Sequence, residues 1–84
     1  MYVDPEADKA IGVLVRTWRR NAGMTQAKLA ERVGTHRPII GRVERGVHLP
    51  SLITLSCIAQ ATGGDMRSVG TIVDTMTVRI RCSG

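Results

Sequence analysis

The sequence is poor in aromatic residues and in cysteine, and each shortage excludes a class of function. Tyr2 and Trp18 are the only aromatic residues of the 84. Proteins that bind single-stranded nucleic acid by stacking bases on aromatic side chains need more of them. Cys57 and Cys82 lie far apart, without a C-x-x-C pair or a companion histidine. We therefore expect no metal site and no other cofactor.

Long apolar runs and targeting signals are also missing. The uncharged segment from Val47 to Gly64 is interrupted by Pro50, by serines and by Gln60, so it does not predict a membrane-spanning helix. The N-terminus is acidic and lacks the basic and apolar stretches of a signal peptide. We expect a cytoplasmic protein without membrane contact.

The motifs of enzyme active sites are absent as well. The sequence contains no nucleophile elbow, no phosphate-binding loop and no paired carboxylates at catalytic spacing. We therefore do not expect an enzyme, and the function must come from binding.

What the sequence does have is positive charge, concentrated in the middle of the chain. Its net charge is +5, but residues 16–46 hold eight Lys and Arg and two Glu, eight minus two, or +6. Residues 1–8 hold three acidic residues before the first lysine. A basic segment of this kind favours a polyanion as partner. A solvated face remains the alternative for a charge run taken alone.

The apolar spacing and the capping residues predict four helices in one small domain. After an acidic arm over residues 1–7, a first helix begins at Asp8 and ends at Asn21-Ala22-Gly23. Thr25 caps a second helix, which Gly34 ends. A third helix lies within residues 35–46.

Two residues inside this third helix are unusual for a helix. The stretch from Thr35 to Gly46 reads THRPIIGRVERG. We expect Pro38 in the first turn, where a missing N–H costs no hydrogen bond, with Arg37 at the N-cap. We expect Gly41 on the outer face, where the lack of a side chain allows close approach of a partner. Ser51 caps a fourth helix that ends at Gly63-Gly64.

The C-terminal part follows a different pattern. Residues 66–73 are ambiguous, and we expect a short helix or turn there. From Thr75 to Cys82, apolar and polar residues alternate, and many are β-branched. This alternation predicts a β-strand. The expected fold is therefore mainly α, with four to five helices and a short C-terminal β-strand extension.

The second and third helices carry the marks of a known family. They are joined through Gly34, with the small residue Ala30 four positions earlier, which permits a close helix crossing and a tight turn. The sequence from about Asp8 to Gly63 resembles the phage repressor/Cro type of helix-turn-helix, also called the xenobiotic-response-element family. The residues that carry the resemblance are Thr25-Gln26, Leu29-Ala30, Gly34, Ile40, Arg42-Val43-Glu44-Arg45-Gly46 and Pro50-Ser51-Leu52.

The resemblance implies a fold and a partner. It implies a lambda-repressor-like helix-turn-helix domain over residues 8–64 that binds double-stranded DNA as a symmetric dimer. Residues 65–84 would then be an extension that makes the dimer contact or binds a protein partner.

The resemblance also assigns roles to single residues. The third helix would lie in the major groove. The residues expected there at base edges are Arg37, Pro38, Gly41 and Arg42. Arginine can make a bidentate contact with guanine. The alternative is that the two arginines meet only phosphates. The residues expected at DNA phosphates are Thr25, Gln26, Arg45 and His48. Arg19 and Glu44 would form an internal salt bridge.

The leading hypothesis is a repressor that binds a palindromic operator as a homodimer, in a nucleoid-associated location. The half-sites would lie about one helical turn, ~34 Å, apart. One alternative is an antitoxin that binds a toxin through residues 65–84 and autoregulates its operon. Another is a helical domain that binds duplex DNA without sequence preference.

Overall fold

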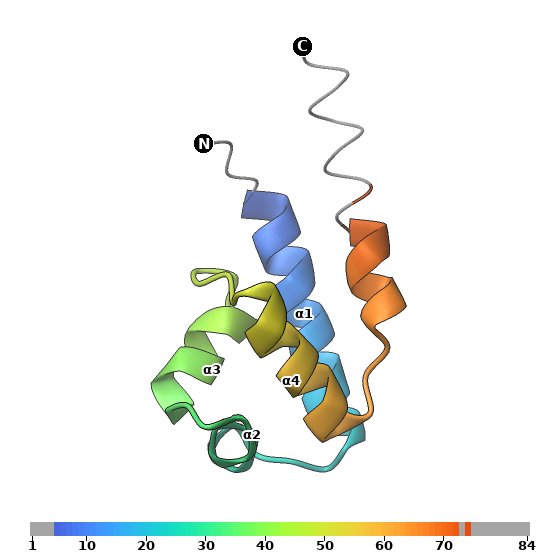
Figure 1. The fold of residues 1–84 in the computed structure, drawn as a ribbon. Coiled ribbons are helices and arrows are strands. Elements are labelled where there is room, and N and C mark those ends of the chain that lie inside the picture. Colours follow the sequence, from blue (N-terminus) through green and yellow to red (C-terminus); the bar gives the residue numbers. More distant parts are fainter. Residues whose placement is uncertain (1–4, 73, 75–84) are drawn as a thin grey trace.

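The computed structural model describes residues 5–72 and residue 74, and it is a small stack of helices (Figure 1). The four labelled helices are α1 (Pro5–Asn21), α2 (Gln26–Val33), α3 (Arg37–Glu44) and α4 (Leu52–Thr62). Residues 66–72 form a further helical segment after α4. No described helix is long and apolar enough to cross a membrane.

Helix α1 begins earlier than the sequence predicted. It starts at Pro5 instead of Asp8, so residues 5–7 belong to the helix and not to an arm. Proline is favoured at the first helical position because its fixed φ angle suits the helix and no N–H is lost there. Glu6 and Asp8 lie in the first turn and Arg19 in the last, which matches the helix dipole at both ends.

Helix α2 begins and ends where its capping residues predicted. The Thr25 side chain accepts a hydrogen bond from the backbone N–H of Lys28 at 3.1 Å. Gly34 adopts a left-handed conformation with φ 76°, and its N–H bonds back to the carbonyls of Ala30 and Glu31. Because other residues rarely adopt this φ, the turn between α2 and α3 depends on glycine.

Helix α3 contains both unusual residues, as predicted, but its first residue differs from the prediction. The N-cap is His36, and Arg37 is already the first helical residue. Pro38 is therefore the second, where its missing N–H is among those that have no partner within the helix. The expectation that Arg37 is the N-cap is wrong by one position.

Helix α4 also matches its predicted caps. The Ser51 hydroxyl accepts from the N–H of Thr54 at 3.1 Å, and Gly63 ends the helix with φ 76°. The helix contains no acidic or basic residue in its eleven positions, so it depends on its caps and on packing.

The core lies where α1 meets α3 and α4, and where α2 meets the same two helices. Val15, Leu29 and Ile58 have no exposed surface. The complete set of buried apolar residues is Ile11, Val15, Trp18, Leu29, Ala30, Ile40, Val43, Leu55, Ile58, Ala59 and Val69.

Two glycines permit close packing that a side chain would prevent. A Cβ at Gly12 would lie 2.5 Å from the carbonyl oxygen of Val43 and 2.7 Å from that of Glu44. Gly12 therefore lets α1 approach the C-terminal turn of α3. A Cβ at Gly64 would overlap the ring of Trp18.

The predicted β-strand extension is wrong for the part of the chain that the structure describes, because no strand occurs in residues 5–72 and 74. The extension that follows α4 is helical over residues 66–72, which agrees with the short helix or turn expected at 66–73. The Asp65 carboxylate accepts from the N–H of Arg67 at 2.9 Å and caps this segment. Met66, Val69 and Ile72 pack onto the core at the three-residue spacing of a helix. The alternating stretch from Thr75 to Cys82 lies outside the described residues.

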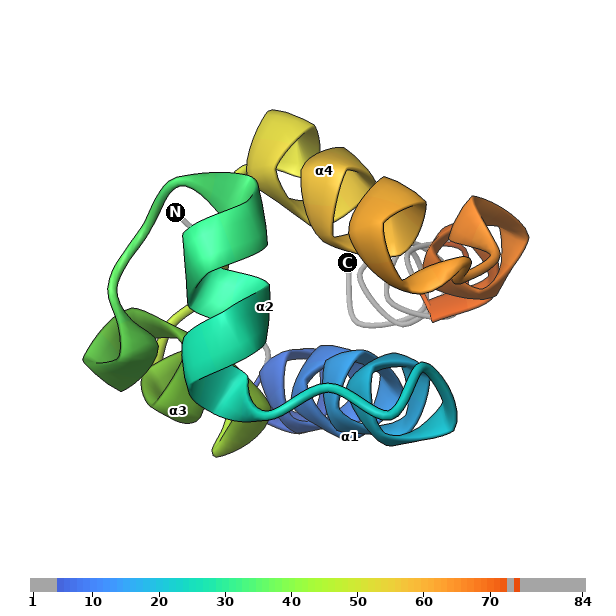
Figure 2. The ribbon, with the colours of Figure 1, turned by 90° about the horizontal axis from the view of Figure 1, so that it is seen from below.

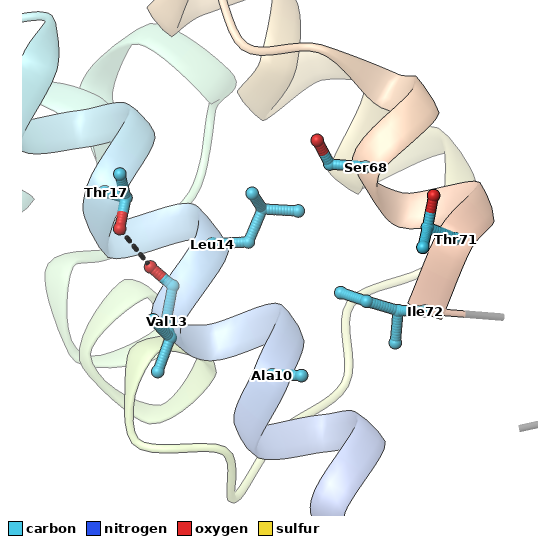
Figure 3. Close-up of a pocket in the computed structure, with 7 residues that line it drawn as sticks. All are labelled: Ala10, Val13, Leu14, Thr17, Ser68, Thr71 and Ile72. Carbon is cyan, nitrogen blue, oxygen red and sulfur yellow. Dashed lines mark hydrogen bonds between the residues drawn. The ribbon is translucent and has the colours of Figure 1, made fainter. Parts of the chain in front are cut away.

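Helix α1 and segment 66–72 face each other across an open, mainly apolar groove (Figure 3). Leu14 and Ile72 point into it from the two sides. The residues that line the groove are Ala10, Val13, Leu14, Thr17, Ser68, Thr71 and Ile72.

Candidate nucleic-acid interface

Helix α3 lies at the edge of the molecule, on the side away from segment 66–72, in both views (Figures 1 and 2). Ile40 and Val43 point into the core and fix the helix. Arg37, Pro38 and Arg42 are exposed. The helix therefore presents two guanidinium groups to solvent from a rigid support.

A buried carboxylate at the end of α3 joins this helix to α1. The Glu44 residue is only 4 % exposed. The Arg19 Nε donates to its Oε2 at 2.7 Å, and the Arg19 Nη2 donates to its Oε1 at 3.1 Å. The Arg16 Nε donates to the same Oε1 at 3.3 Å. The structure thus brings together the expected pair and adds a second arginine.

The electrostatics of this cluster keep Glu44 ionised. Burial by itself raises the pKa of Glu44, but the hydrogen bonds and the charge of Arg19, together with hydrogen bonds from Gln26 and Arg16, bring the pKa below its ordinary value. The same contact raises the pKa of Arg19, against the effect of its own burial. The negative charge is therefore neutralised inside the protein and does not oppose a polyanion.

Gln26 connects this cluster to the start of α3. Its Nε2 donates to Glu44 Oε1 at 3.2 Å. Its Oε1 accepts from the Nη1 of Arg37 at 3.1 Å. The two contacts fix the orientation of the amide, because Nε2 must face the carboxylate and Oε1 the guanidinium. They also hold one end of the Arg37 side chain in place.

Two partners of Glu44, Arg16 and Gln26, were not expected from the sequence. Arg16 lies three residues before Arg19, so both side chains lie on one face of α1. That spacing was a usable signal. Nothing in the sequence indicated the contact of Gln26, because it depends on how α2 crosses α3.

The other residues expected at the interface differ in exposure. Thr25, Arg45 and His48 are exposed. The Thr25 hydroxyl accepts the N–H of Lys28 and keeps its own hydrogen for donation. Gly41 is buried instead of lying open on the outer face. A Cβ there would lie 3.4 Å from Arg45 Nη1 and 3.7 Å from Gln26 Oε1. The Arg45 and Gln26 side chains therefore lie over Gly41 at van der Waals distance.

Within residues 5–72 and 74, no group of three His, Cys, Asp or Glu side chains is placed to hold a metal ion. The features gathered around α3 are instead cationic and hydrogen-bonding groups on a helix that packs against α1 and α2. Such a surface can bind an anionic polymer through charge and through directed N–H donors.

Comparison with known proteins agrees with this geometry. The helix-turn-helix family model matches residues 15–68, more than half of the chain. An HTH-type transcriptional regulator of Methanothermobacter thermautotrophicus is 48% identical over 50 residues, which are 60% of this chain and 72% of that protein. An HTH-type transcriptional regulator of Mycobacterium tuberculosis is 43% identical over 50 residues, or 60% of this chain, and the match spans only 36% of that regulator.

A solved structure shows the same fold. The clp gene regulator ClgR from Corynebacterium glutamicum superposes with a TM-score of 0.73 and 23% identity, over 92% of this chain and 83% of that chain. This chain therefore belongs to the helix-turn-helix family of the phage repressor/Cro type, and its domain is the DNA-binding domain of a transcriptional regulator.

Proposed function

We propose that this protein is a sequence-specific repressor that binds a palindromic operator in double-stranded DNA as a homodimer. The observation that carries the proposal is the exposed face of α3, with Arg37 and Arg42 held on a helix that the Glu44 cluster fixes in place. Occupancy of an operator is enough to block transcription, so no catalytic group is needed. Such a protein acts in the cytoplasm, at the nucleoid.

Arg42 is the best candidate for direct reading of a base. Its side chain makes no hydrogen bond or ion pair within the described part of the chain, and it lies on a helix that can enter the major groove. A free guanidinium there can donate two parallel hydrogen bonds to guanine. Arg37 has one nitrogen bound by Gln26 and would read a base with the others. Pro38 would contact a thymine methyl.

The remaining residues would position the protein on the phosphates. Gln26 uses one Nε2 hydrogen for Glu44, which leaves the second for a phosphate at the start of α2. Thr25 adds a hydroxyl donor at the same helix end, where backbone N–H groups favour an anion. Arg45 and His48 would contact the backbone from the loop after α3. Gly41 would allow close approach of the DNA to α3, beside the Arg45 and Gln26 side chains.

The test compares Arg42→Ala with Arg45→Ala on a site selected from random duplex and on its single-base variants. Arg42→Ala should cost ~1–3 kcal/mol and relax the preference at one position of the site. Arg45→Ala, the matched control, should weaken all sequences about equally and reduce the salt dependence. If Arg42→Ala also weakened all sequences equally, Arg42 would be a phosphate contact.

A second candidate function keeps the DNA-binding domain and adds a protein partner. In this case the chain is an antitoxin whose residues 65–84 bind a toxin. The groove between α1 and segment 66–72 is the observation in its favour, because it is apolar and open (Figure 3). Copurification with one stoichiometric partner encoded beside this chain would support it, and a homodimer free of other proteins would count against it.

A further inference from the structure

Two arginines of α1 share one buried carboxylate of α3. The Glu44 side chain has no exposed surface, and both Arg16 and Arg19 donate to it. Two positive charges and one negative charge leave this cluster with a net charge of +1. The Arg19 side chain is only 12% exposed, whereas that of Arg16 is 42% exposed. The surplus positive charge of the cluster is therefore accessible to a partner at Arg16.

The hydrogen bonds within the cluster hold Arg16 less tightly than Arg19. Arg19 donates to the carboxylate through two nitrogens, at 2.7 and 3.1 Å, and its Nη1 donates to the carbonyl of Met24 at 2.9 Å. Arg16 donates only through Nε, at 3.3 Å, to the oxygen that already accepts from Arg19 and Gln26. The Nη1 and Nη2 groups of Arg16 make no hydrogen bond within the described part of the chain. A guanidinium can bind a phosphate through two such parallel donors.

Arg16 lies beside a residue that is proposed to contact DNA. The Arg16 Nε and the Gln26 Nε2 donate to the same oxygen of Glu44, so the two side chains meet at one point. At its other end, the Gln26 amide accepts from Arg37, which is exposed on α3. A continuous line of hydrogen-bonded groups therefore runs from α1 past the start of α2 to α3.

We propose that Arg16 binds a phosphate of the DNA backbone next to Gln26, and that the DNA interface therefore extends to α1. This inference deepens the proposed function and rests on it. Nη1 and Nη2 of Arg16 would meet the phosphate while its Nε stays on Glu44. Because Glu44 already orients the guanidinium, little side-chain freedom is lost on binding. The phosphate would also neutralise the surplus charge of the cluster.

A purely structural arginine would stabilise the fold without contacting DNA, and the two roles have different readouts. Loss of a structural contact lowers the free energy of unfolding. Loss of a phosphate contact makes the affinity for DNA less dependent on salt, because one counterion fewer is released on binding. Each phosphate contact contributes about 0.9 to the slope of log affinity against log salt concentration. The slope therefore reports the contact itself.

The test measures the affinity of Arg16→Gln and Arg16→Lys for the selected duplex between about 50 and 200 mM salt. Arg67→Gln is the matched control. It removes the same charge from a side chain that is 93% exposed, in segment 66–72, on the side of the molecule away from α3 (Figures 1 and 2). Arg16→Lys keeps the charge and can bind a phosphate as a point charge. Urea unfolding of each protein measures any loss of stability in parallel.

Over this range, the affinity of the unmodified chain should fall about 3.5-fold more than that of Arg16→Gln, which should also bind more weakly at low salt. Arg16→Lys and Arg67→Gln should keep the slope of the unmodified chain. The proposal is overturned if Arg16→Gln keeps the full slope, whatever its stability, or if either of the other two variants loses as much of the slope as Arg16→Gln.

Random duplex separates this inference from the proposed function. A phosphate contact carries no sequence information, so Arg16→Gln should reduce the slope on random duplex as well. Equal affinity for the selected and the random duplex, with a reduced slope in Arg16→Gln, would refute the proposed function and leave the inference standing. Sequence-specific binding with an unaltered slope in Arg16→Gln would do the reverse. Binding to neither duplex would overturn both.

Discussion

Glu44→Gln tests the cluster that holds α1, α2 and α3 together. The substitution keeps the size of the side chain and removes its charge. The Glu44 carboxylate accepts two hydrogen bonds from Arg19, one from Arg16 and one from Gln26. A glutamine amide has one acceptor oxygen, and its NH₂ group would face a donor. The Arg19 side chain is only 12% exposed and would lose its counter-charge.

The magnitude follows from breaking a buried ion pair on one side. Such a change costs about 3–5 kcal/mol, because a charge is left buried without compensation. A domain of 84 residues has a total stability of about 4–13 kcal/mol, at 0.05–0.15 kcal/mol per residue. We therefore expect Glu44→Gln to remove a large share of the free energy of unfolding.

The assay is urea unfolding at neutral pH, followed by circular dichroism. The matched control is Glu31→Gln, the same substitution at an exposed position, where Lys28 lies 3.9 Å away. That variant should change the free energy of unfolding by less than about 0.5 kcal/mol. If Glu44→Gln unfolded at the same urea concentration as the unmodified chain, the cluster would not be holding the three helices together.

Three further predictions concern the same elements. The folded state lowers the pKa of Glu44 from 4.5, so its ion pair stabilises the protein above that pH, and this stabilisation is lost as the pH falls through the lowered value. In acid, the free energy of unfolding of Glu44→Gln, measured with urea, should therefore depend less on pH than that of the unmodified chain. Gly12→Ala should cost ~1–3 kcal/mol in thermal melting, since its Cβ would lie 2.5 Å from a carbonyl oxygen of α3. Gly70→Ala is the control: its Cβ would have no atom within 4 Å, so the variant should melt at or above the temperature of the unmodified chain. Gln26→Met should relax base preference at the position that Arg37 is proposed to read. A double-mutant cycle of Gln26 and Arg37 should give a coupling of ~0.5–3 kcal/mol, and purely additive effects would refute the link.

The helix boundaries that depend on local chemistry were predictable from the sequence. Thr25 and Ser51 cap their helices with a side-chain oxygen, and Gly34 ends α2 because it tolerates positive φ. These effects act within a few residues, so the sequence contains all the information. The first residues of α1 and α3 were predicted less accurately. A proline such as Pro5 or Pro38 fits at more than one position in the first turn of a helix, so it does not fix where the helix begins.

The contacts that depend on packing were only partly predictable. Arg19 and Glu44 were expected as a pair through the family resemblance, whereas Gln26 entered the cluster through the crossing of α2 and α3. Gly12 showed no local reason to be glycine, and its role follows from the approach of α1 to α3. Gly41 was expected in the open, but the Arg45 guanidinium lies above it.

The extension was ambiguous because two local patterns meet in it. The alternation from Thr75 onward favoured a strand, and residues 66–73 before it were expected to form a short helix or turn. Met66, Val69 and Ile72 have the spacing of a helix and a core to pack against, and that packing decides the segment. Gly70 does not prevent the helix, because no side chain is needed at its exposed position.

The central claim is sequence-specific binding of duplex DNA through α3, and site selection tests it most directly. Random duplex is selected with the full chain, and the enriched sequence is titrated against random duplex at several salt concentrations. We expect a two-fold symmetric site, bound much more tightly than random duplex, with affinity falling steeply as salt rises. Equal affinity for the selected and the random duplex would contradict the claim.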